Sequence, residues 1–268
     1  MTALTAETTT AARVSAPGSH AIPLSRLTGI ELRKMFDTRS GFWLMAGIVI
    51  SAVLATTTVV LFAPDADLTY NTFAAAVGFP MAVILPMVAI LSVTSEWSQR
   101  SGLTTFTLVP HRGRVLAAKA AAAVSVAVAS MAIAFAVGAL GNVFGTALNG
   151  TDPVWNMQLV DCLLIVLGNT LGLLLGFTLG VLLRSSAGAI VAYFVSSLLL
   201  PTLGGLLAQQ QEWFRHLQPW VDFNFAQGAL FNGAPSAEQW AQLGVASTIW
   251  LVVPLLVGLR LLLRSEVK

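Results

Sequence analysis

Charged residues are scarce in this chain. Aspartate, glutamate, lysine and arginine make up 10% of the 268 residues, whereas hydrophobic residues make up 56%. Soluble domains carry about 25% charged residues, so a water-soluble fold of this composition would have too little polar surface to face water. The length leaves room for one membrane domain and no separate soluble domain.

Cysteine and histidine are also rare, and familiar catalytic motifs are missing. Cys162 is the only cysteine, which excludes an internal disulfide and a thiolate metal cluster. The histidines, His20, His111 and His216, lie far apart in the sequence. There is no G-x-x-x-x-G-K-[ST] phosphate-binding loop, no G-x-S-x-G and no H-E-x-x-H. We therefore expect no enzymatic activity, no metal site and no cofactor in this chain, and no nucleic-acid partner.

What the chain does contain is a series of long stretches almost without charge. Each has the roughly 20 apolar residues that a helix needs to cross a hydrocarbon core of about 30 Å. Lipid cannot satisfy free backbone groups, so only helices or closed barrels cross it, and these runs are continuous rather than alternating. The sequence predicts an all-α integral membrane protein whose six transmembrane helices span about 41–63, 73–94, 115–140, 157–183, 187–208 and 240–263.

The lysines and arginines lie almost entirely on one side of these spans. Of the 14 in the chain, only Arg215 falls on the other side. The positive-inside rule then predicts that both termini are cytoplasmic, in a multi-pass protein of a bacterial plasma membrane. Residues 1–21 are rich in Thr and Ala and lack a signal-peptide layout. We expect them to form a disordered cytoplasmic tail, with residues 22–268 forming the membrane domain.

Two cytoplasmic segments stand out. Residues 22–36 fit an amphipathic helix lying along the membrane surface, although the alternative is a plain lead-in to the first span. On a helical wheel its apolar arc holds Leu24, Leu32, Met35 and Phe36, and the opposite arc holds Arg26, Gly29 and Arg33. The connection between the second and third spans is too long for a tight turn. It would either present Leu103 and Phe106 on a short helix to a protein partner or form an ordinary basic loop.

These two segments resemble those of type-2 ABC exporter permeases. The order Glu96-Trp97, Arg100-x-Gly-Leu-Thr104, Pro110, Arg114 and Lys119 is similar to the family's loop between its second and third spans, and Arg26-Leu with Glu31-Leu-Arg-Lys34 is similar to its N-terminal elbow helix. The likeness covers about residues 24–120 in motif and 24–268 in layout. It implies an elbow helix carrying Arg26, Glu31, Arg33 and Lys34, and a coupling helix around residues 101–109. The implied ATPase-coupling residues are Glu96, Trp97, Arg100, Leu103, Thr104 and Phe106.

The resemblance also implies partners. Such a chain is half of a transmembrane unit, so it pairs in the lipid bilayer with a second copy or a paralogue. Two copies of a separate soluble ABC ATPase, which bind ATP and Mg, would dock underneath. The missing phosphate-binding loop agrees with this division of labour.

The external segment before the last span concentrates aromatic residues, which favour the membrane–water interface. Family members carry re-entrant or interfacial helices there, so we interpret it as an external lid; a plain aromatic belt is the alternative. The candidate lid residues are Trp213, Phe214, Trp220 and Phe223.

Glycines and prolines mark positions inside the spans. A four-residue repeat in the fourth span leaves one helix face without side chains, so that a neighbouring helix can approach closely; it consists of Gly168, Gly172, Gly176 and Gly180. Prolines interrupt the second, fifth and sixth spans and favour kinks. In family terms the second and fifth spans border the substrate cavity. The candidate pathway residues are Phe79, Met81, Met87, Tyr193, Phe194, Ser196 and Ser197, although each has packing or lipid contact as an alternative.

Three other functions stay open. An ion-coupled transporter usually places carboxylates at mid-membrane, whereas the acid nearest to a span interior here, Asp161, lies about one turn inside the fourth span. A lipid-modifying enzyme would need a convergent polar set, for which His216, Asp222 and Glu212 are the nearest candidates. A sensor or scaffold that does not transport is the third. The sequence favours a permease subunit that moves an apolar or amphipathic substrate outward.

Overall fold

The computed structural model describes residues 23–98 and 112–264, and within these ranges the chain is helical, without a β-strand. Six helical segments are long and apolar enough to cross a membrane. The prediction of an all-α protein with six spans is therefore confirmed for the described residues.

The first four spans are single helices, whereas the last two are composite. In chain order the elements are α1 (Leu24–Asp37), α2 (Arg39–Phe62), the short η1 (Asp65–Asp67), α3 (Tyr70–Ser98), α5 (Arg112–Asn149), α6 (Leu159–Leu183), α7 (Ser186–Phe194), η2 (Val195–Leu199), α8 (Leu200–Gln210), α9 (Glu212–Val221), α10 (Phe223–Gly228), η3 (Ala229–Phe231), α11 (Ala237–Ser247), η4 (Thr248–Val252) and α12 (Val253–Arg264). The fifth span is α7–η2–α8 and the sixth is α11–η4–α12. Both η2 and η4 are π-helical turns, which the sequence did not indicate.

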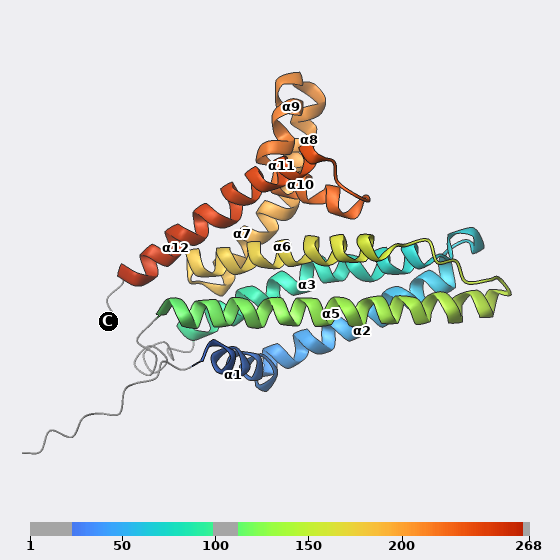
Figure 1. The fold of residues 1–268 in the computed structure, drawn as a ribbon, viewed down its shortest axis with the longest axis horizontal. Coiled ribbons are helices and arrows are strands. Elements are labelled where there is room, and N and C mark those ends of the chain that lie inside the picture. Colours follow the sequence, from blue (N-terminus) through green and yellow to red (C-terminus); the bar gives the residue numbers. More distant parts are fainter. Residues whose placement is uncertain (1–22, 99–111, 265–268) are drawn as a thin grey trace, which may run out of the picture.

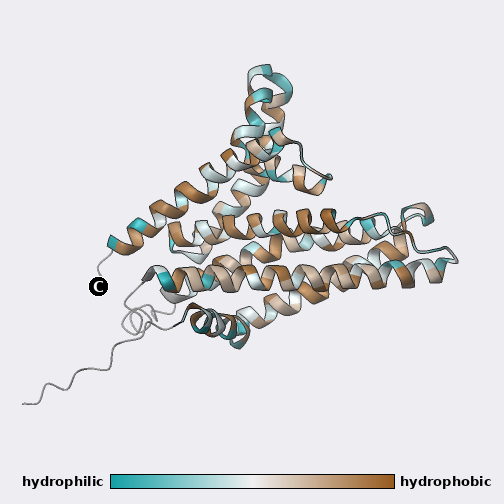
Figure 2. Cartoon of the chain, in the orientation of Figure 1, coloured by the Kyte–Doolittle hydropathy of each residue, from teal (hydrophilic) through white to brown (hydrophobic). Residues whose placement is uncertain are grey.

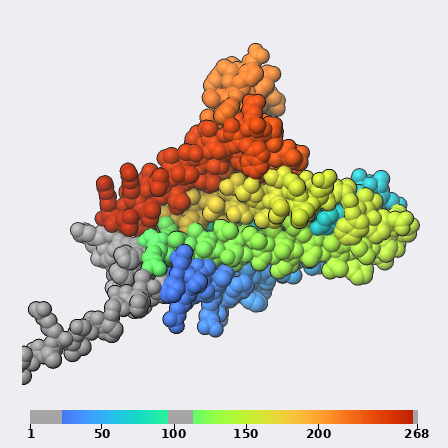
Figure 3. Space-filling view, in the orientation of Figure 1, coloured from blue at the N-terminus to red at the C-terminus, as the bar shows by residue number. Residues whose placement is uncertain are grey.

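The spans form two groups (Figure 1). Helices α2, α3, α5 and α6 run side by side as a bundle, and α3 contacts the other three. Helices α7–α8 and α11–α12 leave this bundle at an angle, and α9 lies at the far tip. Figure 3 shows the C-terminal elements, in orange and red, standing out from the yellow and green helices of the bundle. We call the segment from α9 to η3, Glu212–Phe231, the cap.

The bundle is held by close packing of small side chains. Helix α3 buries Val77, Met81 and Leu85 completely against its neighbours, and α5 supplies Ala122 and Ala127, also fully buried. Alanines let helix backbones approach closely, which matters in lipid because no hydrophobic effect drives helices together there.

The outer spans present apolar side chains to their surroundings. Only 17% of the most apolar window of α2 is buried, and likewise of α7–α8, against 50% for α6. Figure 2 shows these helices coloured brown along much of their length, while teal residues gather at helix ends and on α9. The apolar surface therefore suits lipid contact or a partner span.

Helix α5 extends well past the predicted limit of residue 140. It reaches Asn149, a length of 38 residues, because its last turns keep one small-residue face against α2 and α3. A Cβ at Gly145 would lie 2.9 Å from Val60 Cγ2, and Asn142 is fully buried and donates to the Val154 carbonyl. Tertiary packing thus maintains the helix where the hydropathy signal stops.

The repeated glycines of α6 lie at close contacts with α3 and with the cap. A Cβ at Gly176 would lie 2.8 Å from the Pro86 carbonyl oxygen, and one at Gly180 would lie 3.5 Å from Ile90. One turn or more away, a Cβ at Gly168 would lie 2.6 Å from the Phe231 ring, and one at Gly172 would lie 3.3 Å from the Gln227 amide. The glycine row of α6 therefore packs against two elements, α3 and the cap.

We expect Gly176→Ala to lower the stability of the bundle. Its methyl group would meet the α3 backbone at Pro86, which cannot rotate away, so the free energy of unfolding should fall by about 1–3 kcal/mol. Gly47→Ala is the matched control, because a Cβ at that mid-span glycine meets no atom within 4 Å. Thermal unfolding of the detergent-solubilised proteins measures the difference; equal midpoints would contradict the close contact between α3 and α6.

Candidate functional site

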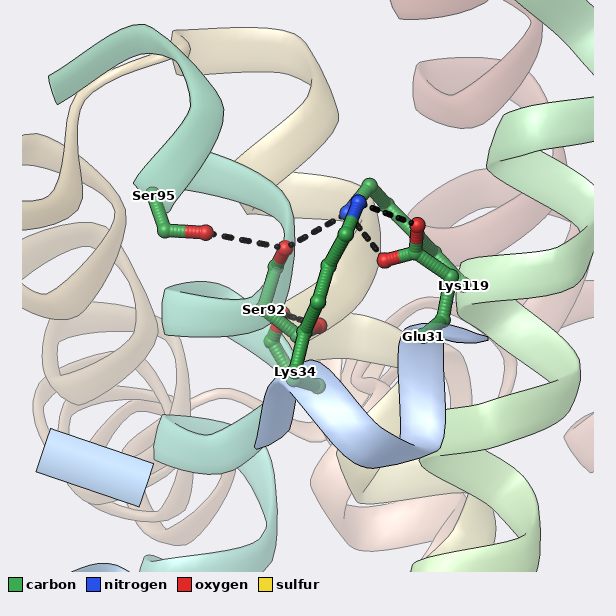
Figure 4. A network of polar contacts seen from close by, with 6 residues as sticks. Glu31, Lys34, Ser92, Ser95 and Lys119 are labelled. Carbon is green, nitrogen blue, oxygen red and sulfur yellow. Dashed lines mark hydrogen bonds and ion pairs between the residues drawn. The ribbon is translucent and has the colours of Figure 1, made fainter. Parts of the chain in front are cut away.

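One end of the bundle is organised by a buried carboxylate on α1. Glu31 is 6% exposed and Lys119 of α5 is 3% exposed. The Lys119 Nζ donates to Glu31 Oε2 at 2.5 Å, and Lys34 Nζ donates to Glu31 Oε1 at 2.8 Å. Lys119 also donates to the Ser92 carbonyl of α3 at 3.2 Å. The resulting cluster, shown in Figure 4, joins α1, α3 and α5; we call it the Glu31 clasp.

The clasp shows how α1 is oriented. The face of α1 that packs against the bundle carries Leu27, Glu31 and Met35, one turn apart from each other. Leu24 and Phe36, on the predicted apolar arc, are exposed instead, and Arg26 and Arg33 are also exposed. A helical wheel did not identify this face because the buried position between the two apolar ones is an acid whose partner lies 88 residues away.

The residues expected to couple to an ATPase are only partly visible. Arg100, Leu103, Thr104 and Phe106 lie outside the described residues. Glu96 and Trp97 belong to the last turns of α3, but their side chains are likewise not described. The structure does place the helix ends on either side of this connection. Ser92 lies near the end of α3 and Lys119 lies two turns into α5, and both belong to the Glu31 clasp.

A second polar contact joins the second and fifth spans. Pro86 has no N–H, so the carbonyl of Ala82, four residues earlier in α3, lacks its helical partner. The Tyr193 hydroxyl of α7 donates to this carbonyl at 2.8 Å. The ring of Tyr193 is buried, so an unpaired carbonyl at this point would be costly.

A third polar contact also pairs a carbonyl that a proline leaves without a donor, this time in the fifth span. In the π-helical turn η2, the Leu200 N–H bonds to the Val195 carbonyl, five residues back. In that register the Ser196 carbonyl would pair with residue 201, which is a proline and has no N–H. The Asn224 side-chain amide of α10 donates to the Ser196 carbonyl at 2.8 Å instead.

Other donors attach the cap to the fourth and sixth spans. The Gln227 side-chain amide donates to the Gly168 carbonyl of α6 at 2.6 Å. The Trp250 indole N–H of η4 donates to the Val221 carbonyl at the end of α9, at 2.8 Å. The cap is thereby hydrogen-bonded to the fourth, fifth and sixth spans.

The candidate lid residues have unequal environments. Phe223 is 2% exposed and packs in the apolar cluster beneath the cap, whereas Trp213 is 62% exposed on α9. Trp213 makes an edge contact with Phe214 at 5.6 Å between ring centroids. Phe214 and Trp220 are half-buried. Phe223 thus has a packing role, and Trp213 is available to the surroundings.

The candidate pathway residues do not converge on one cavity. Phe79 is 78% exposed on α3, while Met81 is fully buried in the bundle core. Met87 packs against the apolar cluster that includes Tyr193, and Phe194 is exposed. Ser196 and Ser197 both donate to the Tyr193 carbonyl, at 2.9 and 2.6 Å. The second and fifth spans are therefore joined at Tyr193 rather than separated by an open path.

A cavity lies instead between the fifth span and the cap. It has a volume of about 680 Å³ and is lined by Pro201, Gly205, Ala208, Gln209, Arg215, Gln218, Asp222, Asn224 and Phe225. A second cavity of about 370 Å³ adjoins it and shares Asn224 and Phe225. Sequence reasoning noted Arg215 as the single cation on this side, but it did not identify Gln218, Asn224, Gln227 or Trp250. A proline in the sequence indicates that a backbone carbonyl of the preceding turn lacks its helical donor. No local sequence signal indicates which distant side chain donates to that carbonyl.

The acids near the cap serve the helix termini. Asp222 caps α10 by accepting from the backbone N–H groups of Asn224 and Phe225, at 3.0 and 3.1 Å. Asp161 forms a capping box with Gln158 at the start of α6. Over residues 23–98 and 112–264, no three His, Cys, Asp or Glu side chains are grouped so as to hold a metal ion.

Comparison with known proteins adds no relative. No family model matches the chain, and no curated protein matches it either.

We expect Lys119→Met to destabilise the protein strongly. It leaves Glu31 buried with the exposed Lys34 as its ion-pair partner, and breaking a buried pair costs about 3–5 kcal/mol. Lys34→Met is the control, because its side chain is 45% exposed and exposed pairs contribute about 0–1 kcal/mol. Thermal unfolding in detergent compares the two, and adding Glu31→Gln to Lys119→Met should recover part of the loss. Equal effects of the two lysine changes would refute the clasp.

A Tyr193→Phe change should weaken the joint between the second and fifth spans. It removes the donor to a carbonyl that Pro86 leaves unpaired, at a cost of about 1 kcal/mol or more. Tyr70→Phe is matched to it, since the Tyr70 hydroxyl meets the Phe135 carbonyl only at 3.4 Å. Hydrogen exchange of α3 around residue 82 should accelerate in the first variant and not in the second; unchanged exchange in both would argue against the assigned contact.

Proposed function

We propose that this chain is the transmembrane permease subunit of an ATP-driven exporter of the ABC type-2 kind. It would move an apolar or amphipathic substrate, such as a drug, an antibiotic peptide or a lipid, outward across a bacterial plasma membrane. A separate soluble ATPase, present in two copies, would bind ATP and Mg. A second copy of the chain or a paralogue would complete the transmembrane unit, with the termini cytoplasmic.

The observation that carries this proposal is the Glu31 clasp. It connects α1 to α3 and α5, about two turns from the points where these two helices run into residues 99–111. A displacement of that connection by a docked ATPase would reach α1, α3 and α5 together. This arrangement suits a membrane subunit that is moved by an ATPase docked on its cytoplasmic side.

The two outer spans fit the moving part of alternating access. Each contains a π-helical turn followed by a proline, Pro201 in the fifth span and Pro254 in the sixth. Such interruptions weaken the helical hydrogen-bond ladder locally and often coincide with functional bends. The spans contain only the acids Asp161 and Glu238, both in first helical turns, which favours an external energy source over ion coupling.

The proposal is tested with the soluble protein that an adjoining gene encodes, if that protein carries a phosphate-binding loop. It should co-purify with this chain, and vesicles holding both should export a fluorescent amphiphile when ATP is supplied. Glu96→Ala and Arg100→Ala, or deletion of residues 101–109, should lower ATP-driven export at least about tenfold, as for other coupled sites. Membrane insertion should be unaffected.

Glu212→Ala supplies the control, because it removes an acid from the cap, at the other end of the spans. Normal export by the Glu96 and Arg100 variants would refute the coupling assignment. Uphill transport by the chain alone on an ion gradient would refute the proposed function itself.

A further inference from the structure

The larger cavity lies at the end of the fifth span. Its α8 wall consists of residues from the last three turns of that span, which ends at Gln210. The opposite wall is α9, a helix rich in Trp and Phe, the residues that gather at the membrane–water boundary. The cavity therefore lies where the fifth span ends, between an apolar helix and a helix that carries interfacial aromatic residues.

The α8 wall of the cavity is largely apolar. The α8 residues Pro201, Gly205 and Ala208 are small, and a Cβ at Gly205 would meet no atom within 4 Å. Phe225, which closes this wall from α10, is 52% exposed. A hydrocarbon chain can lie along such a surface without displacing any side chain.

The polar side of the cavity carries one cation, Arg215. Arg215 is the only lysine or arginine between Arg184 and Arg260. Its Nε donates to the Ala208 carbonyl at 3.2 Å, which fixes the guanidinium group against the cavity wall. Within the described part of the chain, no ion pair involves Arg215 and its two terminal nitrogens have no protein acceptor. A guanidinium group presented in this way matches the two oxygens of a phosphate.

The one acid of the cavity is already occupied. Asp222 Oδ1 accepts two backbone N–H groups at the start of α10, and its Oδ2 accepts from Gln218 Nε2 at 3.2 Å. Gln218 is itself only 5% exposed. Asp222 thus stabilises the wall of the cavity and does not pair with Arg215. The guanidinium group of Arg215 can therefore bind an incoming anion.

The adjoining cavity has a different character. It is lined by the uncharged amides Asn224, Asn232, Gln239 and Gln242 together with Phe225. Each of these amides makes one hydrogen bond within the protein and keeps further donor and acceptor capacity. A headgroup with hydroxyls therefore fits there while its anionic group lies on Arg215.

We propose that this pair of cavities binds an anionic phospholipid, with its phosphate on Arg215, its headgroup hydroxyls at the amides and an acyl chain along α8. The site does not depend on the proposed export function, because it is built within one chain and needs no ATPase.

The test uses the purified chain in nanodiscs that contain phosphatidylglycerol with a photoreactive diazirine on one acyl chain. After illumination, mass spectrometry should find lipid adducts within residues 201–225 at a higher level than with phosphatidylcholine carrying the same acyl chain. Arg215→Gln should reduce the phosphatidylglycerol adducts in this segment roughly tenfold, the loss expected when a charged hydrogen bond is removed.

Two further variants separate a specific site from a general effect. Arg264→Gln removes a cation at the end of α12, away from the cavity, and should leave the labelling of residues 201–225 unchanged. Gly205→Leu keeps Arg215 but fills the apolar wall, so it should also reduce the labelling, and it provides a second reading if Arg215→Gln folds poorly. Millimolar inorganic phosphate should compete weakly, because it offers no acyl chain.

The outcomes are decisive in either direction. Equal labelling by the two lipids, or labelling that survives both Arg215→Gln and Gly205→Leu, would overturn the proposal. Full competition by inorganic phosphate would replace the lipid site by a site for small anions. None of these results bears on whether an ATPase drives the chain, which the export assay decides separately.

Discussion

The arrangement of the spans depends on one constraint: a backbone carbonyl within lipid must find a donor. Pro86 in the second span and Pro201 in the fifth leave the carbonyls of Ala82 and Ser196 without helical partners. The donors, Tyr193 and Asn224, belong to the fifth span and to the cap. Each proline therefore creates a contact between distant parts of the chain, and together they connect α3 to α7 and the fifth span to α10.

The two groups of spans differ in how densely they pack. In the bundle, glycines and alanines bring backbones together, so α2, α3, α5 and α6 gain stability from dispersion over large contacts. The fifth and sixth spans bury less of their surface than α3, α5 or α6. They are held by close packing of Gly258 on Leu182 of α6 and by hydrogen bonds of Ser186 and Tyr193 with α3, while Gln227 and Trp250 attach the cap to the fourth and sixth spans. Because the second group buries less surface, its rearrangement would disrupt less packing than a rearrangement of the bundle.

The sequence predicted the spans well because hydropathy over some 20 residues is a strong signal. It also located the helix before the first span and the glycine row of α6. It did not predict that α5 would reach Asn149 or that Leu27 and Glu31, rather than Leu24 and Phe36, face the bundle. Those features depend on partners far away in the chain, namely Lys119 for Glu31 and the α2 and α3 surfaces for the end of α5. The π-helical turns were also not predicted. A proline indicates a break in the helical hydrogen-bond pattern, but it does not indicate how the preceding turn adapts to that break.

The candidate site follows the same pattern. Glu31 and Lys119 both belonged to the sequence motifs, but only the fold shows that they contact each other. The candidate pathway residues rest on span number and residue type, neither of which can tell an exposed Phe79 from a buried Met81. Arg215 stood out by its sign, whereas the cavity beside it depends on how α9 folds back along α8.

The turn between α6 and α7 has a mechanical consequence. It consists of Arg184, in the left-handed region at φ 52°, and Ser185, which caps α7. From this tight corner the two spans diverge (Figure 1). The fifth span is 25 residues long, about 37 Å at helical rise. If the fifth span turned as one rigid rod about this corner, a rotation of about 5° would carry Gln210 through roughly 3 Å, about the length of one hydrogen bond.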